Sequence, residues 1–177
     1  ELELRPLSAA DVARCAELHV QAFPGFSLSQ LGPRFLREFY RGFLGDPDAV
    51  AIVAANAAGQ VVGAVVGTSA PSGFFSRLLR RRLLGFAWAS FLVVLRRPTT
   101  APRPLRAVAY RGQVPVEVSG ALLSSICVDP AAQGTGAGSL LIDRFTALAH
   151  ERGTGAYLLT DRDENDAVNA FYVRKGW

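Results

Sequence analysis

The sequence of 177 residues contains no methionine and only two cysteines, and only 19% of its residues are charged. Half of the residues are hydrophobic, so the chain has enough apolar surface to bury, and intrinsic disorder is excluded. Cys15 and Cys127 lie 112 positions apart, which excludes a disulfide-rich scaffold and suits a reducing cytoplasm. About four methionines would be usual, so we expect that both ends were trimmed. The length fits a single domain over residues 1–177.

Acidic residues are missing from positions 77–111, although nine arginines fall there. This segment carries +9, and because the whole chain carries +4, the remaining residues carry −5. The basic character therefore comes from one Arg-rich insert, at about residues 70–118. Its longest apolar run, residues 83–95, has 13 residues, fewer than the about 20 that a membrane-spanning helix needs. A buried helix is the default interpretation of this run, and a membrane-surface helix is the alternative.

Hydrophobic periodicity elsewhere predicts alternating strands and helices. Strands are expected at residues 2–6, 49–54, 61–66, 121–128 and 156–160. Helices are expected at residues 9–22, 33–44, 136–152 and 165–175, with one or two more between 74 and 95 and a kink at Gly85. An antiparallel hairpin followed by strand–helix–strand–helix predicts an α/β fold, a mixed central sheet with helices on both faces.

A glycine-rich stretch, residues 128–141, connects a strand directly to a helix. Glycines at 134, 136 and 138 let the backbone turn tightly and expose N–H groups at the positive end of the helix dipole, which suits a phosphate or pyrophosphate. The phosphate loop of nucleoside triphosphatases requires a lysine after its last glycine, and Ser139-Leu140 follows here. A dinucleotide fingerprint requires a third glycine where Ser139 stands.

The remaining pattern, Gln133-x-x-Gly136-x-Gly138, resembles the acyl-CoA pyrophosphate loop of the GNAT superfamily of N-acyltransferases. The segment from Asn165 to Trp177 resembles the last conserved helix of the same superfamily. It departs from that pattern in its lysine, which is displaced to Lys175, and in Val168, which occupies an alanine position. The superfamily normally continues with two more strands, so we expect that the end is truncated or that a second chain of a homodimer supplies them.

The resemblance implies an acetyl-CoA-dependent acyltransferase without a metal, and it assigns residues to the acetyl-CoA. The backbone at Ile126, Cys127 and Val128 would pair with the pantetheine arm, and Asn165 would hold that arm. The pyrophosphate loop would comprise Gln133, Gly134, Thr135, Gly136, Ala137, Gly138 and Ser139. Tyr172 would protonate the departing thiolate.

The acceptor amine must lose a proton before it attacks the thioester. Many family members carry a glutamate on the strand before the loop, where this sequence has serines. The candidates for this role are Glu117, His19, Glu38, or a water chain organised by Ser124 and Ser125. Cys127 could form an acyl intermediate, but direct transfer is usual in the superfamily, and a small apolar strand residue is the favoured interpretation.

The acceptor would be a small-molecule amine, with Phe23, Phe26 and Tyr40 as candidate pocket walls. The first loop and the long insert resemble a bacterial branch of the superfamily associated with surface polysaccharides and amino sugars. Three interpretations of the arginines in the insert remain open: a solvated face, a site for an anionic acceptor, or a contact with anionic lipid. No sequence feature favours nucleic-acid binding. Two alternative functions remain open: a protein N-terminal or lysine acetyltransferase, and a CoA-binding regulatory module without turnover.

Overall fold

The computed structural model describes residues 1–24, 27–96, 119–159 and 166–177. In chain order its elements are β1 (Glu3–Pro6), the 3-10 turn η1 (Ala9–Asp11), α1 (Val12–Ala22), α2 (Ser27–Gln30), α3 (Gly32–Arg41), β2 (Ala49–Ala55), β3 (Val61–Thr68), α4 (Pro71–Arg81), α5 (Leu83–Arg96), β4 (Ala121–Val128), the 3-10 turn η2 (Pro130–Ala132), α7 (Ala137–Glu151), β5 (Ala156–Leu158) and α8 (Asp166–Arg174). Every strand and helix expected from periodicity is present. Among the described residues, the short α2 and the turn η2 were not expected from the sequence.

The five strands form one sheet in the order β1-β2-β3-β4-β5. The first three pairings are antiparallel, and β4 and β5 are parallel, with α7 as the crossover between them. The register between β3 and β4 shifts at Ser124: Gly67 pairs with Leu123, whereas Val66 pairs with Ser125. Ser124 is therefore the extra residue of a β-bulge in the middle of β4.

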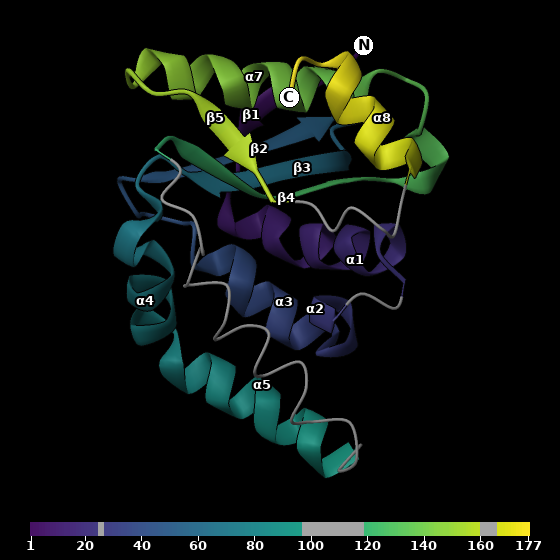
Figure 1. Cartoon of the computed structure of the whole chain (residues 1–177). Helices are drawn as coiled ribbons and strands as arrows, with labels where there is room; N and C mark the ends of the chain where they lie inside the picture. Colours follow the sequence, from purple (N-terminus) through teal and green to yellow (C-terminus); the bar gives the residue numbers. More distant parts are fainter. Residues whose placement is uncertain (25–26, 97–118, 160–165) are drawn as a thin grey trace.

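Helices cover both faces of the sheet (Figure 1), so the expected mixed α/β architecture is confirmed. On one face α7 packs against β2, β3 and β4 through residues such as Leu141 and Phe145, and α8 lies beside α7. On the other face α1 and α3 pack against the sheet, and α4 and α5 lie farther out. All eight residues of β3 are buried, as its uninterrupted apolar run predicts for a central strand.

The start of α1 is held by an ion pair to the first strand. The Arg5 guanidinium donates to both carboxylate oxygens of Asp11 at 2.7 and 2.8 Å, and the Ser8 N–H donates to Asp11 Oδ2 at 2.9 Å. These hydrogen bonds, Arg5 first, hold the pKa of Asp11 well below its usual 3.8. A carboxyl whose pKa is lowered by folding stabilises the fold above its unfolded pKa, and this contribution fades as the pH falls toward the folded pKa.

We therefore expect Asp11→Asn to lower the free energy of unfolding at pH 7 by about 1 kcal/mol, a modest value because the Arg5 side chain is partly exposed to screening water. The difference from the wild type should shrink below pH 3.8, where the unfolded chain takes up the proton. Urea unfolding at pH 7 and pH 3 measures it. Asp143→Asn, which removes a mostly exposed partner of Lys175, is the control and should change stability by only a few tenths of a kcal/mol, on the order of 0.3. A difference for Asp11→Asn that is equal at both pH values would contradict this account.

The helical insert breaks at Arg82, between α4 and α5, so the expectation of a kink at Gly85 was wrong. Gly85 lies inside α5, where a Cβ would come within 2.3 Å of Glu38 Oε2. Its small size is needed for the close approach of α5 to α3. Arg82 donates two hydrogen bonds to the same Glu38 carboxylate at 2.9 and 2.5 Å, which fixes the first turn of α5 on α3.

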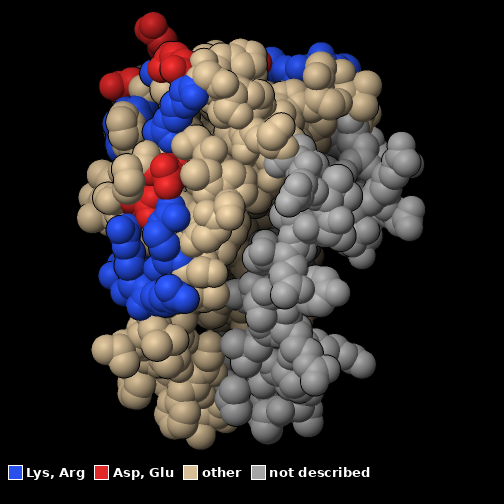
Figure 2. Space-filling model, turned by 60° about the vertical axis from the view of Figure 1, so that its left-hand side comes forward, with Lys and Arg blue, Asp and Glu red and all other residues tan. Residues whose placement is uncertain are grey.

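Other arginines of the insert are also paired with carboxylates. Arg77 contacts Asp48 and Asp46, and Arg81 contacts Asp46 at 3.1 Å. Figure 2 shows basic and acidic side chains gathered on this face of the molecule. These pairs tie α4 to the loop before β2 and neutralise part of the +9 that the sequence assigns to the segment. Arg96, Arg97, Arg103, Arg106 and Arg111 have no described side chains.

Candidate active site

The glycine-rich loop follows β4 directly and is anchored by Asp129. Arg14 of α1 donates to the Asp129 carboxylate at 2.5 Å and, through Nε, to the Val61 carbonyl at 3.1 Å. Asp129 also accepts from the Ala131 N–H at 2.9 Å, and its own N–H donates to the Val62 carbonyl at 2.8 Å. The start of the loop is therefore fixed to β3 and α1.

The loop ends in a helix N-terminus with unpaired donors. Gly134 and Gly136 have φ of +80° and +89°, in the left-handed region that favours glycine, and Gly136 is the N-cap of α7. The Leu140 N–H donates to the Gly136 carbonyl at 3.0 Å. The four preceding N–H groups, those of residues 136–139, have no acceptor in the part of the chain that the structure describes. They are available to an anion, and the dipole of a helix of 15 residues stands behind them.

One edge of β4 is open next to this loop. β4 pairs with β5 only from Ala121 to Leu123, and among the described strands none pairs with Ser124–Val128 on that side. Ile126, Cys127 and Val128 therefore offer backbone groups to an added extended chain, as their assignment to the pantetheine arm requires. Loop donors and open edge are contiguous, because β4 runs directly into the loop.

α8 lies against the start of α7 (Figure 1), which brings Tyr172 to this part of the molecule. A Cβ on Gly138 would lie 3.6 Å from Phe171 Cζ, so the helix that carries Tyr172 packs on the loop. The side chain of Tyr172 is partly buried between Phe171 and Trp177, with ring centroids 5.5 and 6.3 Å away. Burial raises the pKa of Tyr172 to about 12, so its hydroxyl stays protonated at neutral pH and can donate a proton.

The C-terminal residues hold α8 in place. The Trp177 N–H donates to the Tyr172 carbonyl and the Gly176 N–H to the Val173 carbonyl, at 3.1 and 3.0 Å, with Gly176 at a φ of +80°. This is a Schellman motif, which explains the glycine before the final aromatic residue. Trp177 then packs on Phe145, and the Lys175 ammonium pairs with Asp143 at 2.8 Å. The displaced lysine thus joins α8 to α7.

A buried polar cluster lies on the opposite face of β4. Tyr40 Oη is 3.1 Å from His19 Nδ1 and 3.5 Å from Cys127 Sγ, and Ser125 Oγ is 3.4 Å from His19 Nδ1. All four residues are buried. Sequence reasoning named each of them separately but did not place them together; the signal was that one of only two histidines falls on an apolar helix stripe.

The cluster changes the interpretation of two residues. Tyr40 is 1% exposed, so it is a core residue with a hydrogen-bonded hydroxyl and not an open pocket wall. Burial raises the pKa of Cys127 to about 11, which keeps its thiol protonated at neutral pH and argues against an acyl-cysteine. Cys15 is buried as well and its thiol pKa is raised by burial.

Other candidates are placed less favourably or lie outside the described residues. Glu38 is engaged by Arg41 and Arg82, so it is a structural ion-pair partner and not a free base. Phe23 packs on the His19 ring with centroids 5.1 Å apart, next to the polar cluster. Glu117, Phe26 and Asn165 lie outside the described residues.

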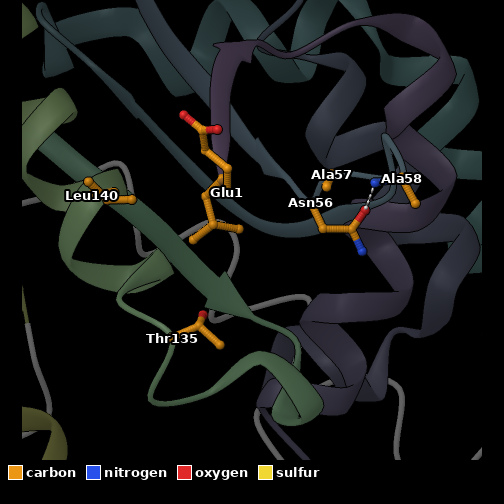
Figure 3. Close-up of a pocket in the computed structure, with 7 residues that line it drawn as sticks. Glu1, Asn56, Ala57, Ala58, Thr135 and Leu140 are labelled. Atoms are coloured by element: carbon orange, nitrogen blue, oxygen red, sulfur yellow. Dashed lines mark hydrogen bonds between the residues drawn. The ribbon is translucent and has the colours of Figure 1, made fainter.

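An open depression of about 620 Å³ adjoins the outer side of the loop (Figure 3). The N-terminal residues, the turn of the β2–β3 hairpin, Thr135 and Leu140 line it, and its lining is mostly apolar. Only Thr135 belongs to the predicted pyrophosphate loop, so this depression is not the candidate anion site. Among the described residues no group of three His, Cys, Asp or Glu side chains is placed to hold a metal ion. Within the same residues, no helix has the length and apolarity to cross a membrane.

Several solved structures resemble this fold over nearly the whole chain. The aminoglycoside 6'-N-acetyltransferase AAC(6')-Ih from Acinetobacter baumannii has a TM-score of 0.63 at 12% identity, covering 100% of this chain and 90% of that one. AAC(6')-Iy, solved in complex with a CoA bisubstrate analogue, has a TM-score of 0.60 at 11% identity, and the alignment covers 99% of this chain and 88% of that one. A ribosomal-protein-alanine N-acetyltransferase from Brucella melitensis biovar Abortus has a TM-score of 0.53 at 18% identity, and the alignment covers 98% of this chain and 90% of that one. These similarities show a shared fold. No curated protein matches the chain.

The model of the acetyltransferase (GNAT) family matches residues 12–177, nearly the whole chain. The match spans the anchored loop after β4, the open strand edge and the aromatic end of α8. The chain therefore belongs to the GNAT family of acetyltransferases.

Proposed function

We propose that this acetyltransferase moves the acetyl group of acetyl-CoA to the primary amine of a small-molecule acceptor. The observation that carries the proposal is the helix N-terminus at residues 136–139, whose four N–H groups are unpaired among the described residues and follow directly from the open β4 edge. Unpaired donors in one helical turn suit a pyrophosphate, and an open strand edge suits the amides of a pantetheine arm. The residues present thus fit acetyl-CoA, which supplies the activated acetyl group.

The polar cluster beside β4 supports a small acceptor. Ser125 of β4, His19 of α1 and Tyr40 of α3 are buried where these helices meet the sheet, which suits a single amine or a water better than a peptide lying on an open surface. Ser125 Oγ would take the proton of the acceptor amine and pass it to His19 Nδ1, with the Tyr40 hydroxyl orienting the imidazole ring. Tyr172, neutral at physiological pH, would return a proton to the departing thiolate.

Turnover with a panel of amines tests the proposal. Release of free CoA thiol from acetyl-CoA is followed with amino sugars, aminoglycosides, polyamines and short peptides, while acetyl-CoA binding is measured separately by calorimetry. Turnover with a small amine and not with peptides is expected. Turnover with peptide N-termini or lysines alone would overturn the acceptor class in favour of a protein acetyltransferase. Binding without any thiol release would favour the regulatory module.

Ser125→Ala should lower kcat by about tenfold or more with little change in the Kd for acetyl-CoA, because it interrupts the proton path to His19 and leaves the loop intact. The matched control is Ser69→Ala, which also removes a hydrogen-bonded serine hydroxyl but follows the C-terminal end of β3, where its partners are Asp48 and Arg152 and not the His19 cluster. Steady-state kinetics on both variants decides. Equal kcat values for the two variants would remove Ser125 from the mechanism.

A further inference from the structure

α5 presents a continuous apolar stripe to solvent on the side away from α3. Leu84, Trp88, Phe91 and Leu95 recur at spacings of four, three and four residues, and their exposed fractions range from 55% to 86%. The rings of Trp88 and Phe91 stack with centroids 6.0 Å apart. The expectation of a buried helix therefore holds for one face of α5 only. A stripe of this size on a folded helix marks a binding surface.

The opposite side of α5 is firmly attached to the protein. Phe86 and Ala89 are buried, and the Phe86 ring lies 4.8 Å from the Phe35 ring of α3. The Arg82–Glu38 hydrogen bonds fix its first turn. α5 is thus a largely apolar helix of 14 residues, about 21 Å long, which is attached to the protein by one face and presents its outer stripe to solvent.

In the sequence, arginines flank α5 on both sides. Arg80, Arg81 and Arg82 precede α5, and Arg96 and Arg97 end it in the sequence. Arg81 and Arg82 are paired with carboxylates, but Arg80 is exposed and has no carboxylate partner among the described residues. No acidic residue occurs in the sequence between Asp48 and Glu117.

We propose that the outer stripe of α5 docks on an anionic lipid surface, with Leu84, Trp88, Phe91 and Leu95 entering the interface and Arg80 contacting headgroups. Exposed aromatic and leucine side chains on one face, next to a cation, are the chemistry that anionic membranes recognise. A second copy of the chain fits less well, because two α5 helices packed along their stripes would bring like charges together. α5 would lie on the membrane and not cross it.

The position of α5 leaves the acetyl-CoA loop accessible. Figure 1 shows α5 at the end of the molecule opposite α7, with α3, α1 and the sheet between them. Docking through α5 would therefore hold the enzyme at a membrane with the β4 edge and the loop away from it. The inference stands independently of the acceptor proposed above.

Vesicle flotation of the full chain tests the inference. With phosphatidylglycerol–phosphatidylcholine vesicles we expect binding that weakens with salt, and little binding to pure phosphatidylcholine. Trp88 is observed alone in a Trp177→Phe background, and its emission should shift to the blue with anionic vesicles. Absence of binding to anionic vesicles at low salt would overturn the proposal.

Two variants and one control locate the surface. Leu84→Ser with Trp88→Ser should weaken vesicle binding by roughly tenfold or more, and Arg80→Glu by roughly fivefold, with unfolding unchanged because all three side chains are exposed. Leu159→Ser removes a comparably exposed leucine, 61% exposed, at the end of β5 and should bind like the wild type. Equal loss in the Leu159 variant would contradict the assignment to α5.

Size-exclusion chromatography with light scattering distinguishes a lipid surface from the other possible occupants of the α5 stripe. A dimer that the Leu84→Ser/Trp88→Ser pair dissociates, without vesicle binding, would identify the stripe as a self-association face and overturn the proposal. A monomer that binds no vesicles, and whose Trp88 emission is already blue-shifted, would indicate that residues 97–118 cover the stripe, and would overturn it as well. A monomer that binds anionic vesicles supports it.

Discussion

Tyr172→Phe is expected to lower kcat by about 100-fold, the range that a positioned general acid contributes. The phenylalanine keeps the packing on Phe171 and Trp177 and removes only the hydroxyl. The Kd for acetyl-CoA should stay within about twofold, because the loop donors at residues 136–139 are backbone groups that this change leaves in place. Single-turnover kinetics and calorimetry measure the two quantities.

Tyr157→Phe is the matched control for that experiment. Tyr157 lies in β5, and burial raises the pKa of its hydroxyl as well. It pairs with Leu122, on the part of β4 that β5 covers, away from the open edge. We expect the kcat of Tyr157→Phe to remain near that of the wild type.

Because burial raises the pKa of Tyr172 to about 12, the donor role of Tyr172 should produce no fall in the kcat of the wild type between pH 7 and about pH 10. Wild-type turnover by Tyr172→Phe would mean that another group, such as water, protonates the thiolate.

Gly136→Val is expected to raise the Kd for acetyl-CoA by about 30-fold or more. Gly136 has a φ of +89° and its N–H is one of the four loop donors, so a β-branched residue there strains the backbone and misaligns these donors. Loss of one or two charge-assisted hydrogen bonds of about 2 kcal/mol each is enough for that change. Calorimetric titration with acetyl-CoA and with CoA measures it.

A control for the effect of backbone strain alone is available at the C-terminal end of α7. Gly153→Val places valine at a φ of +73° just after α7, again with no atom within 4 Å of the added Cβ. Both variants should lose about 1–2 kcal/mol of folding free energy, because both force a side chain into the left-handed region. Only Gly136→Val should lose acetyl-CoA affinity. Equal Kd values in the two variants would remove the anion site from α7.

Local sequence patterns were sufficient to predict the secondary structure and the glycine-rich loop before α7. Alternating and helical periodicities placed the strands and the longer helices, and β4 was predicted at its observed residues. Glycines at 134 and 136 marked positive φ angles, since other residues rarely adopt them. The Gly176-Trp177 pair, noted in the sequence only as part of the family pattern, forms the Schellman end of α8, a motif that depends on neighbouring residues alone.

Contacts between distant segments could not be predicted in the same way. The break at Arg82 and the role of Gly85 depend on Glu38, more than 40 residues earlier in the chain. Similarly, the sequence left open whether the arginines of the +9 segment form a solvated face, bind an anionic acceptor or contact lipid, and only the structure places Asp46, Asp48 and Glu38 against some of them. Sequence patterns record charge but not which charges pair.

The sequence by itself determined the order of the elements, the glycine loop at the start of α7 and the family resemblance, because each depends on residues close together in the chain. The tertiary structure decided which polar groups meet: His19, Tyr40, Ser125 and Cys127 come from three elements and converge only when α1 and α3 pack on β4. It also decided which face of α5 is buried, since apolar residues occupy nearly every position from 83 to 95 and leave no periodicity to show it. Packing, and not composition, leaves Trp88 and its neighbours open to a partner.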